Sequence, residues 1–410
     1  MPVSLPKVNP YCAGAGSRPP VLAGRNRQLA MVHHLANQFE GRRPAENIVW
    51  TGLRGMGKTV LLRQAQDHLR DRGWLVGYHE VRRSAGLGTS VAAAVTQGLR
   101  ALEPGPLAGA LGWLDDALGP PGVDAPPAGG RGAEARPAGL GGAPTPAEAA
   151  TALGLRPAES GGLPEDALDR LLGRLGEAAA DAGVGVVLLF DELQLTARAD
   201  LAALLHAAQA TEGLPVAFVA AGLPDLPGAV AGAGSYAERL YYDRVDWLSP
   251  GDVREAVVVP AEEFGVTYRA DALELLLTHI ASYPYFAQLY AEETWKAAGT
   301  PSDQPGTVIT AAHVEAALPP AQRRLDEGLY RIRYDKASEA ERAYLGAMAA
   351  LGNERIPSGD VARSLGKTPQ RASPLRDRLL QKGIIYAPAH NVLEFAVPGF
   401  ADYVRRRRGA

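Results

Sequence analysis

Short apolar runs alternate with helical patterns from residue 21 to residue 248. Apolar residues at helical spacing predict helices, and short continuous apolar runs predict strands buried on both faces. Strands that alternate with helices indicate right-handed crossovers and an α/β fold whose parallel sheet is covered on both faces. The predicted strands are residues 47–51, 74–81, 184–190, 215–221 and 241–248. The predicted helices are residues 24–39, 59–72, 164–182 and 201–210.

Three segments depart from this alternation. Residues 1–20 are rich in Pro and Gly and lack an apolar run, so we expect a flexible N-terminus and no signal peptide. The interval from about 103 to 162 is rich in Pro, Gly and Ala and offers too little apolar surface to offset the entropy of ordering it. We expect a mostly disordered surface insertion there, with room for one short helix. From 249 to 335 the pattern becomes all-helical.

Residues 336–410 predict a winged-helix domain with a basic tail. Two helices are expected at 338–350 and 358–365. A third helix runs from Thr368 to Lys382, unless Pro374 interrupts it and moves its start to Ser373. Two short strands follow, at residues 384–387 and 392–396, and flank a turn.

Composition narrows the class of protein. Cys12 is the only cysteine, so no intrachain disulfide can form. Nowhere do 18 apolar residues follow one another, so we expect no transmembrane helix and a cytoplasmic protein. The formal net charge is −3, yet Lys and Arg outnumber Asp and Glu from residue 331 onward. This excess indicates either an anionic partner for the C-terminal segment or simply a solvated charged face.

A glycine-rich loop after the first strand carries the clearest chemistry. Its glycines let backbone N–H groups curl around anionic oxygens, and the helix that follows adds its positive dipole end. Lys58 can reach the β- and γ-phosphates of ATP, and the Thr59 hydroxyl can ligate Mg²⁺. The alternative is a chance glycine-rich turn between a strand and a helix. The expected nucleotide-binding residues are Gly52, Leu53, Arg54, Gly55, Met56, Gly57, Lys58, Thr59 and Val60.

A second motif is Asp191-Glu192, at the end of the apolar run 184–190. The carboxyl end of a buried parallel strand lies at the crevice where α/β sheets bind ligands. Asp191 can hold Mg²⁺ through water there, and Glu192 can orient and deprotonate an attacking water. The alternative is a pair of acidic residues at a helix N-terminus.

With both motifs in place, the chain resembles the origin-recognition-complex-like branch of AAA+ ATPases. The resemblance covers about Pro20 to Arg406, apart from the insertion, and includes the loop sequence GLRGMGKT. It implies a P-loop NTPase core at 21–248, a helical lid at 249–335 and the winged helix. It also implies a contact of Arg25 with the nucleotide base.

Two positions depart from the family pattern. The family usually has glutamate where this chain has Gln28, and it usually has a polar sensor where the fourth strand ends in Ala220-Ala221. Another residue replaces the sensor, or it is missing.

The resemblance assigns two further residues. Arg239 is expected to act across a subunit boundary as an arginine finger if the chain forms a homo-oligomer. The alternative is a surface salt bridge with Glu238 or Asp243. In Tyr283-Pro284-Tyr285-Phe286, Pro284 is expected near the adenine, and the alternative is an aromatic core cluster.

The sequence therefore predicts an ATPase that uses ATP and Mg²⁺ and is coupled to double-stranded DNA through the winged helix. The third helix would present Arg371, Arg376, Arg378 and Lys382 to the major groove, and Arg405 to Arg408 would contact phosphates. One alternative is a signalling switch like those of STAND ATPases, whose winged helix contacts protein. Another is an ATP-binding scaffold that hardly hydrolyses.

Overall fold

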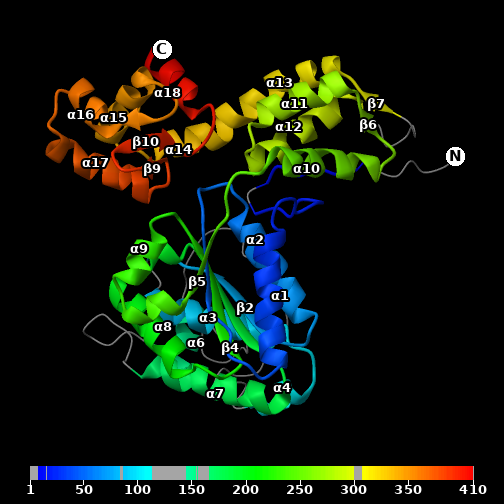
Figure 1. Cartoon of the computed structure of the whole chain (residues 1–410), viewed down its shortest axis with the longest axis vertical. Coiled ribbons are helices and arrows are strands. Elements are labelled where there is room, and N and C mark those ends of the chain that lie inside the picture. The colour runs from blue at the N-terminus through cyan, green and yellow to red at the C-terminus, as the bar shows by residue number, and fades with distance from the viewer. Residues whose placement is uncertain are drawn as a thin grey trace, which may run out of the picture. The chain divides into compact units, whose positions relative to one another are not determined.

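The computed structural model describes residues 8–14, 16–83, 86–112, 145–153, 155, 166–299 and 307–409. The chain divides into two compact units (Figure 1). Unit 1 comprises Met1–Asn26, Gly52–Val60 and Val245–Ala410. Unit 2 comprises Arg27–Thr51 and Leu61–Arg244. In the described residues no helix is long and apolar enough to cross a membrane.

Unit 2 is built on a five-stranded parallel sheet with the order β2-β3-β4-β1-β5. Every residue of β1, β3 and β4 is buried, which explains why these strands read as continuous apolar runs. The α/β fold and all five predicted strands are confirmed. The strands are β1 Ile48–Thr51, β2 Leu75–Glu80, β3 Val186–Asp191, β4 Val216–Gly222 and β5 Tyr241–Arg244.

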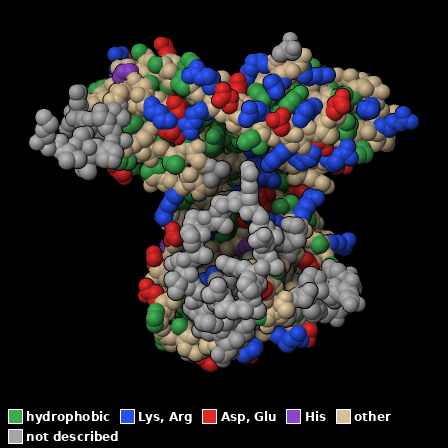
Figure 2. Space-filling view, turned by 180° about the vertical axis from the view of Figure 1, so that it is seen from behind, with side chains coloured by type: hydrophobic (Ala, Val, Ile, Leu, Met, Phe, Trp, Pro, Cys, Tyr) green, Lys and Arg blue, Asp and Glu red, His purple; other side chains and the backbone are tan. Residues whose placement is uncertain are grey.

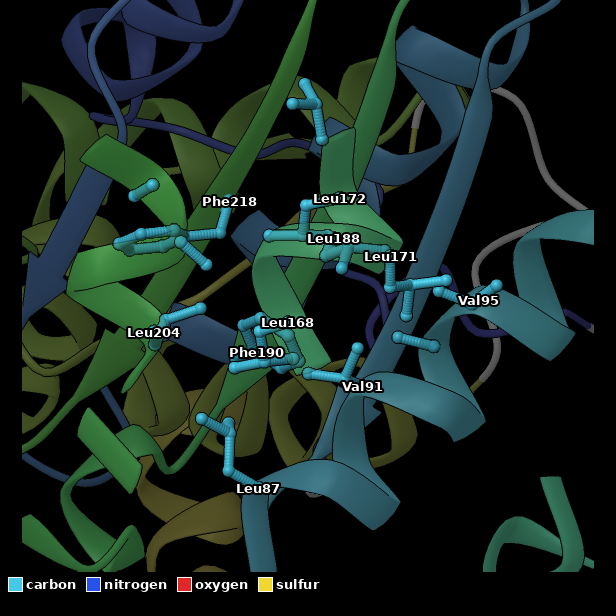
Figure 3. Packing of buried hydrophobic residues seen from close by; sticks show 14 of the residues in the cluster. Leu87, Val91, Val95, Leu168, Leu171, Leu172, Leu188, Phe190, Leu204 and Phe218 are labelled. Atoms are coloured by element: carbon cyan, nitrogen blue, oxygen red, sulfur yellow. The ribbon is translucent and has the colours of Figure 1, made fainter. Parts of the chain in front are cut away.

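Helices cover both faces of this sheet, with α1 on one side and α8 and α9 on the other (Figure 1). Leu and Val side chains of α3, α7 and α8 meet Leu188, Phe190 and Phe218 of the sheet in one hydrophobic core (Figure 3). The helices are α1 Asn26–Glu40, α2 Lys58–Arg70, α3 Gly86–Arg100, α7 Ala167–Ala182, α8 Arg198–Ala210 and α9 Leu226–Ala231. Two 3-10 helices, η1 Leu193–Leu195 and η2 Ser235–Arg239, complete the unit.

The interval predicted as an insertion contributes to this core where the structure describes it. Two short helices form there rather than one, α4 Pro106–Ala110 and α6 Pro146–Ala152. Leu107 and Ala149 of these helices are buried in the core. Burial of such small apolar patches offsets part of the ordering entropy, which composition alone does not reveal. The predicted disorder at 113–144, 154 and 156–162 lies outside the described residues.

The helical part of unit 1 runs from residue 249 to 335. Its helices are α10 Pro250–Glu262, α11 Ala270–Ile280, α12 Pro284–Ala297 and α13 Ala311–Arg324. The last continues through a π-helical turn, η4 Leu325–Tyr330, into α14 Arg331–Asp335. This region is not purely helical, because β6 (Thr267–Tyr268) pairs in parallel with β7 (Val308–Ile309).

The N-terminal segment 8–14 is ordered against these helices, which corrects the expectation of flexibility for this stretch. Tyr11 is 3% exposed, and its hydroxyl donates to the carbonyl of Val257 at 2.5 Å. The Asn9 amide donates to the carbonyl of Glu292, and the Ala13 N–H donates to the Glu292 carboxylate. One aromatic ring with these polar contacts anchors a chain that has too few apolar residues to show a pattern.

The C-terminal part of unit 1 has the order of helices and strands predicted for a winged helix. It contains α15 Glu339–Leu351, α16 Ser358–Ser364 and α17 Pro369–Gln381. It also contains an antiparallel sheet with the order β8-β10-β9. The strands are β8 Ile356–Pro357, β9 Ile385–Ala389 and β10 Val392–Phe395.

Two details of this part differ from the expectation. Pro374 lies inside α17 and does not move its start, because Thr368 caps the helix by accepting from the Arg371 N–H. The basic tail is helix α18 (Phe400–Gly409), whose buried Phe400, Tyr403 and Val404 pack inward. The sequence was interpreted from its four consecutive arginines, and charge alone does not indicate that the preceding apolar residues form a packed helix face.

A matched pair of glycine substitutions tests how tightly α3 packs on β2. A Cβ at Gly77 would lie 1.8 Å from the carbonyl oxygen of Ala94, whereas a Cβ at Gly173 in α7 meets nothing within 4 Å. Gly77→Ala should lower the free energy of unfolding by about 1–3 kcal/mol, because the backbone of α3 must shift. Gly173→Ala should raise it by about 0.5–1 kcal/mol, because helical glycine is entropically costly. Urea titrations measure both, and equal stability of the two variants would contradict the predicted packing.

Candidate nucleotide-binding site

The P-loop follows β1 directly and leads into α2 at Lys58. Gly55 and Gly57 have φ of +87° and +89°, a region that glycine adopts without steric cost. A Cβ at Gly52 would lie 2.2 Å from the carbonyl oxygen of Val245. Three glycines at these places are therefore required by the loop's own shape, and around Gly57 the space is open for a ligand. This cradle fits a phosphate chain at a helix N-terminus.

The Lys58 side chain is directed back to the loop. Its Nζ donates to the carbonyl oxygens of Gly52 at 2.7 Å and Leu53 at 2.9 Å, and the residue is 7% exposed. An ammonium group is a flexible point charge with rotatable donors. Lys58 can therefore keep the loop in shape and still turn one N–H toward a phosphate oxygen.

Arg25 supports the same loop from within unit 1. It is 4% exposed, and its guanidinium donates to the carbonyls of Met56 at 2.9 Å and Asp246 at 2.8 Å. Burial lowers the pKa of Arg25, and the nearby Asp252 and Asp246 oppose that shift. The contact of Arg25 with a nucleotide base stays a prediction. Its hydrogen bonds give it a role in holding the loop.

Gln28 has a local reason to differ from the glutamate usual in the family. Its Nε2 donates to the Asp243 carboxylate at 2.9 Å and to the Arg244 carbonyl at 3.1 Å. A glutamate here would place two carboxylates together, so the amide is the side chain that suits this environment.

Tyr283 links the helical region 249–335 to the P-loop. Its hydroxyl donates to the Arg54 carbonyl at 2.6 Å, and a Cβ at Gly55 would lie 2.1 Å from that hydroxyl. The ring is fully buried and lies 5.5 Å from the Trp247 ring and 4.8 Å from the Phe286 ring. Burial raises the pKa of Tyr283 to about 12, so it remains a donor at neutral pH. The aromatic cluster is core, as the alternative reading proposed.

The role of Pro284 at the adenine stays a prediction. Pro284 is the first residue of α12. The two residues before Tyr283, Ala281 and Ser282, have φ of +49° and +59°. Glycine adopts this left-handed conformation more readily than alanine or serine does.

Arg54 joins the P-loop to the C-terminal part of unit 1. Its Nε donates to the carbonyl of Lys382 at 3.3 Å, just beyond the end of α17. Arg333, 8% exposed, donates to the carbonyl of the next residue, Gly383, at 3.1 Å. Cations suit this place because the carbonyls at a helix C-terminus carry partial negative charge. No motif in the sequence marked this link.

The acidic pair lies at the carboxyl end of β3 in unit 2. Asp191 is 3% exposed and accepts from the Tyr78 hydroxyl at 3.2 Å and from the Glu192 N–H at 2.9 Å. Burial and then the charge of Asp191 raise the pKa of Tyr78, which therefore stays protonated and donates. Arg63 lies over the Tyr78 ring, 3.4 Å from its centroid.

Glu192 has a left-handed backbone, with φ of +55°. Gln194 Nε2 donates to its carboxylate at 2.5 Å, and Gln194 Oε1 accepts from the Leu223 N–H at 3.1 Å, just past the end of β4. Ala220 and Ala221 are fully buried and offer no polar side chain. Gln194 thus provides a polar side chain at the end of β4. The sequence did not indicate this role, because Gln194 follows the acidic pair by two residues and does not belong to β4.

Arg239 forms an ion pair with Glu212 at 2.7 Å, and both side chains are about half exposed. A surface ion pair was the alternative reading, although its partner is neither Glu238 nor Asp243. The finger role stays a prediction, because an exposed pair of this kind is weak enough to exchange partners.

The described residues contain no group of three or more His, Cys, Asp or Glu side chains suited to a metal ion. The assignment of Thr59 and Asp191 as Mg²⁺ ligands stays a prediction.

Two parts of the chain match two different protein-family models. Residues 21–219 match the family model of an AAA ATPase domain, and residues 327–404 match a domain of unknown function (DUF8462). No curated protein sequence matches the chain.

Solved structures are similar at low sequence identity. The Walker-type ATPase PABY2304 of Pyrococcus abyssi has a TM-score of 0.56 and 14% identity, covering 95% of this chain and 97% of that one. The Orc1 protein of Aeropyrum pernix, in complex with DNA, has a TM-score of 0.40 at 15% identity, covering 95% and 94%. The RuvB branch migration motor of Thermotoga maritima has a TM-score of 0.43 at 13% identity, covering 95% and 98%. The first of these likenesses supports the fold alone. With the P-loop geometry and the family match, residues 21–219 of this chain form an AAA ATPase domain.

Proposed function

We propose that the chain binds ATP with Mg²⁺ and hydrolyses it slowly enough to serve as a conformational switch. The observation that carries this proposal is the P-loop, whose carbonyl oxygens are held by Arg25, Lys58 and Tyr283. A loop held through its carbonyls keeps the geometry that presents N–H dipoles to phosphate. Lys58 supplies the cation for the β- and γ-phosphates.

The carboxylates of unit 2 take the remaining roles in this proposal. In the parallel sheet, β3 and β1 end at the same edge, with β4 between them. Asp191 and Thr59 are the proposed Mg²⁺ ligands, and Glu192 is the proposed base that orients and deprotonates water. Arg239 is the proposed finger toward a neighbouring copy if the chain assembles.

Lys58→Ala should abolish ATP binding, because the phosphate charge loses the cation that the loop supplies. Isothermal calorimetry with MgATP measures the affinity. Lys367→Ala is the matched control, since Lys367 is exposed and outside the P-loop. Normal affinity in the Lys58 variant would contradict the P-loop assignment.

Glu192→Gln should leave ATP binding intact and reduce turnover by about 10²–10⁴-fold, because an amide cannot accept the proton of water. Phosphate release under saturating ATP measures turnover, and calorimetry checks that the affinity is retained. Hydrolysis at the wild-type rate would place the base elsewhere.

The proposed output of the switch is the winged helix. The support for coupling is the Arg54 side chain, which joins the P-loop to the carbonyl of Lys382 while Tyr283 holds the carbonyl of Arg54. A change of loop conformation on binding ATP would therefore act on the end of α17. This route needs no movement of one unit relative to the other.

Double-stranded DNA is the proposed partner of that output, and a protein partner is the second candidate. DNA is supported by the basic excess after residue 331 and by the exposed Arg371 near the start of α17. On the face shown in Figure 2, Lys and Arg side chains in the upper part of the view lie among Asp and Glu side chains.

The protein alternative is favoured by how several cations are used internally. Arg378 and Lys382 bind Glu341, which is 1% exposed, at 3.1 and 2.5 Å. Burial alone would raise the pKa of Glu341, but the Lys382 contact and the others lower it. Arg405 donates to the Ala349 carbonyl at 2.7 Å, and Arg406 pairs with Asp326 at 2.7 Å. These four cations are thus less available to phosphates than the sequence alone indicated.

Duplex affinity should fall as salt rises, by about 0.9 log units per phosphate contact for each log unit of salt. Arg371→Ala should weaken binding, whereas Arg378→Ala should chiefly lower stability because it leaves buried Glu341 short of a partner. Arg54→Ala should make duplex affinity the same with ATP and with ADP. Fluorescence anisotropy with mixed-sequence duplex measures the affinities of the three variants, and urea titration measures the stability of the Arg378 variant. No binding by the wild-type chain in either nucleotide would favour the protein partner.

A further inference from the structure

Gln194 bridges the carboxyl ends of two adjacent strands in unit 2. Its Oε1 accepts from the Leu223 N–H, just past β4, at 3.1 Å, and its Nε2 donates to the Glu192 carboxylate, just past β3, at 2.5 Å. A backbone N–H can only donate and a carboxylate can only accept, so these two partners determine which way the amide points. A glutamine amide offers both the acceptor and the donor that such a pair requires.

The surroundings are shaped to receive this amide. Gly222, the last residue of β4, has space for no side chain: a Cβ there would lie 2.6 Å from Gln194 Oε1 and 2.6 Å from Leu226 Cδ2. Glu192 itself has a left-handed backbone, which is unfavourable for a residue other than glycine. Such conformations persist where the surrounding structure holds them in place.

We propose that Gln194 is a positioning residue for hydrolysis, which holds the Glu192 carboxylate in the orientation that activates water. This inference rests on the proposed ATPase function and adds to it the residue that replaces the polar sensor absent from Ala220-Ala221. The bridge also makes the orientation of Glu192 depend on the end of β4. The alternative is that Gln194 only satisfies the Leu223 N–H and has no influence on chemistry.

Two substitutions separate these roles. Gln194→Glu keeps an acceptor for Leu223 at nearly the same shape but replaces the donor that faces Glu192 by an oxygen. Gln194→Met removes both contacts at similar length. Each should lower kcat by about ten- to a hundredfold, the usual effect of losing a hydrogen bond to a charged group. The affinity for MgATP should change less than about twofold, since binding is assigned to the P-loop. Gln209→Met, at an exposed site on α8, is the matched control and should behave as wild type.

A double-mutant cycle with Glu192→Gln provides the readout that a purely structural role would not move. If Gln194 acts through Glu192, Gln194→Met should have no further effect on single-turnover rate when residue 192 is already glutamine. An equal loss in both backgrounds, or wild-type kcat in Gln194→Glu, would overturn the inference.

The experiments distinguish a failure of the proposed ATPase function from a failure of the role proposed for Gln194. If the wild-type chain binds but does not hydrolyse ATP, the ATPase proposal is wrong and Gln194 has no reaction to assist. If the wild type hydrolyses and the Gln194→Glu variant matches it, only the positioning role is wrong. Thermal unfolding of each variant shows whether it is folded, and Gln194→Glu keeps the test valid should Gln194→Met not fold.

Discussion

The carbonyl oxygens of the P-loop are held by Lys58 at the end of the loop and by donors from two distant parts of unit 1, Arg25 and Tyr283. Arg25 precedes the first helix, Lys58 opens α2, and Tyr283 precedes α12, and each donates to a carbonyl between Gly52 and Met56. A tight loop of this kind persists only where its backbone groups are hydrogen-bonded. The same hydrogen bonds tie the helical region 249–335 to the P-loop, because Tyr283 lies in that region and donates to the carbonyl of Arg54.

Buried polar groups are also hydrogen-bonded at the carboxyl ends of the strands in unit 2. Asp191 is buried yet receives hydrogen bonds from Tyr78 and from the backbone of Glu192, so its burial is compensated. Gln194 extends this polar network to the end of β4. Ala220 and Ala221 are buried and offer no polar side chain, and Gln194 reaches the end of β4 from the end of the neighbouring strand.

In the C-terminal domain, buried Glu341 determines which cations remain for a ligand. A carboxylate that is 1% exposed needs partners, and it takes Arg378 and Lys382 from the third helix. The basic excess of this domain is therefore partly a consequence of its own packing. A charge count treats these residues as equal to Arg371, which is exposed.

The local order of residues was sufficient to predict the parallel sheet, the P-loop and the acidic pair. Buried parallel strands must be apolar throughout, and phosphate binding needs glycine, lysine and threonine at close spacing, so both leave a local pattern. Helix α3 left a weaker one, because its small residues serve close packing on Gly77 rather than helical periodicity.

Only the tertiary structure decided the contacts between residues far apart in the chain. Three such contacts join segments that lie far apart in the sequence. They are the hydrogen bond of Tyr283 to Arg54, the hydrogen bond between Gln194 and Leu223, and the ion pair of Lys382 with Glu341. The sequence did not predict that Tyr11 and α18 pack against the rest of the protein, for the same reason. A single buried ring or a short apolar face is stabilised by a surface that lies elsewhere in the sequence. Periodicity and motifs report what a segment does alone, and these residues act only once the chain has brought their partners to them.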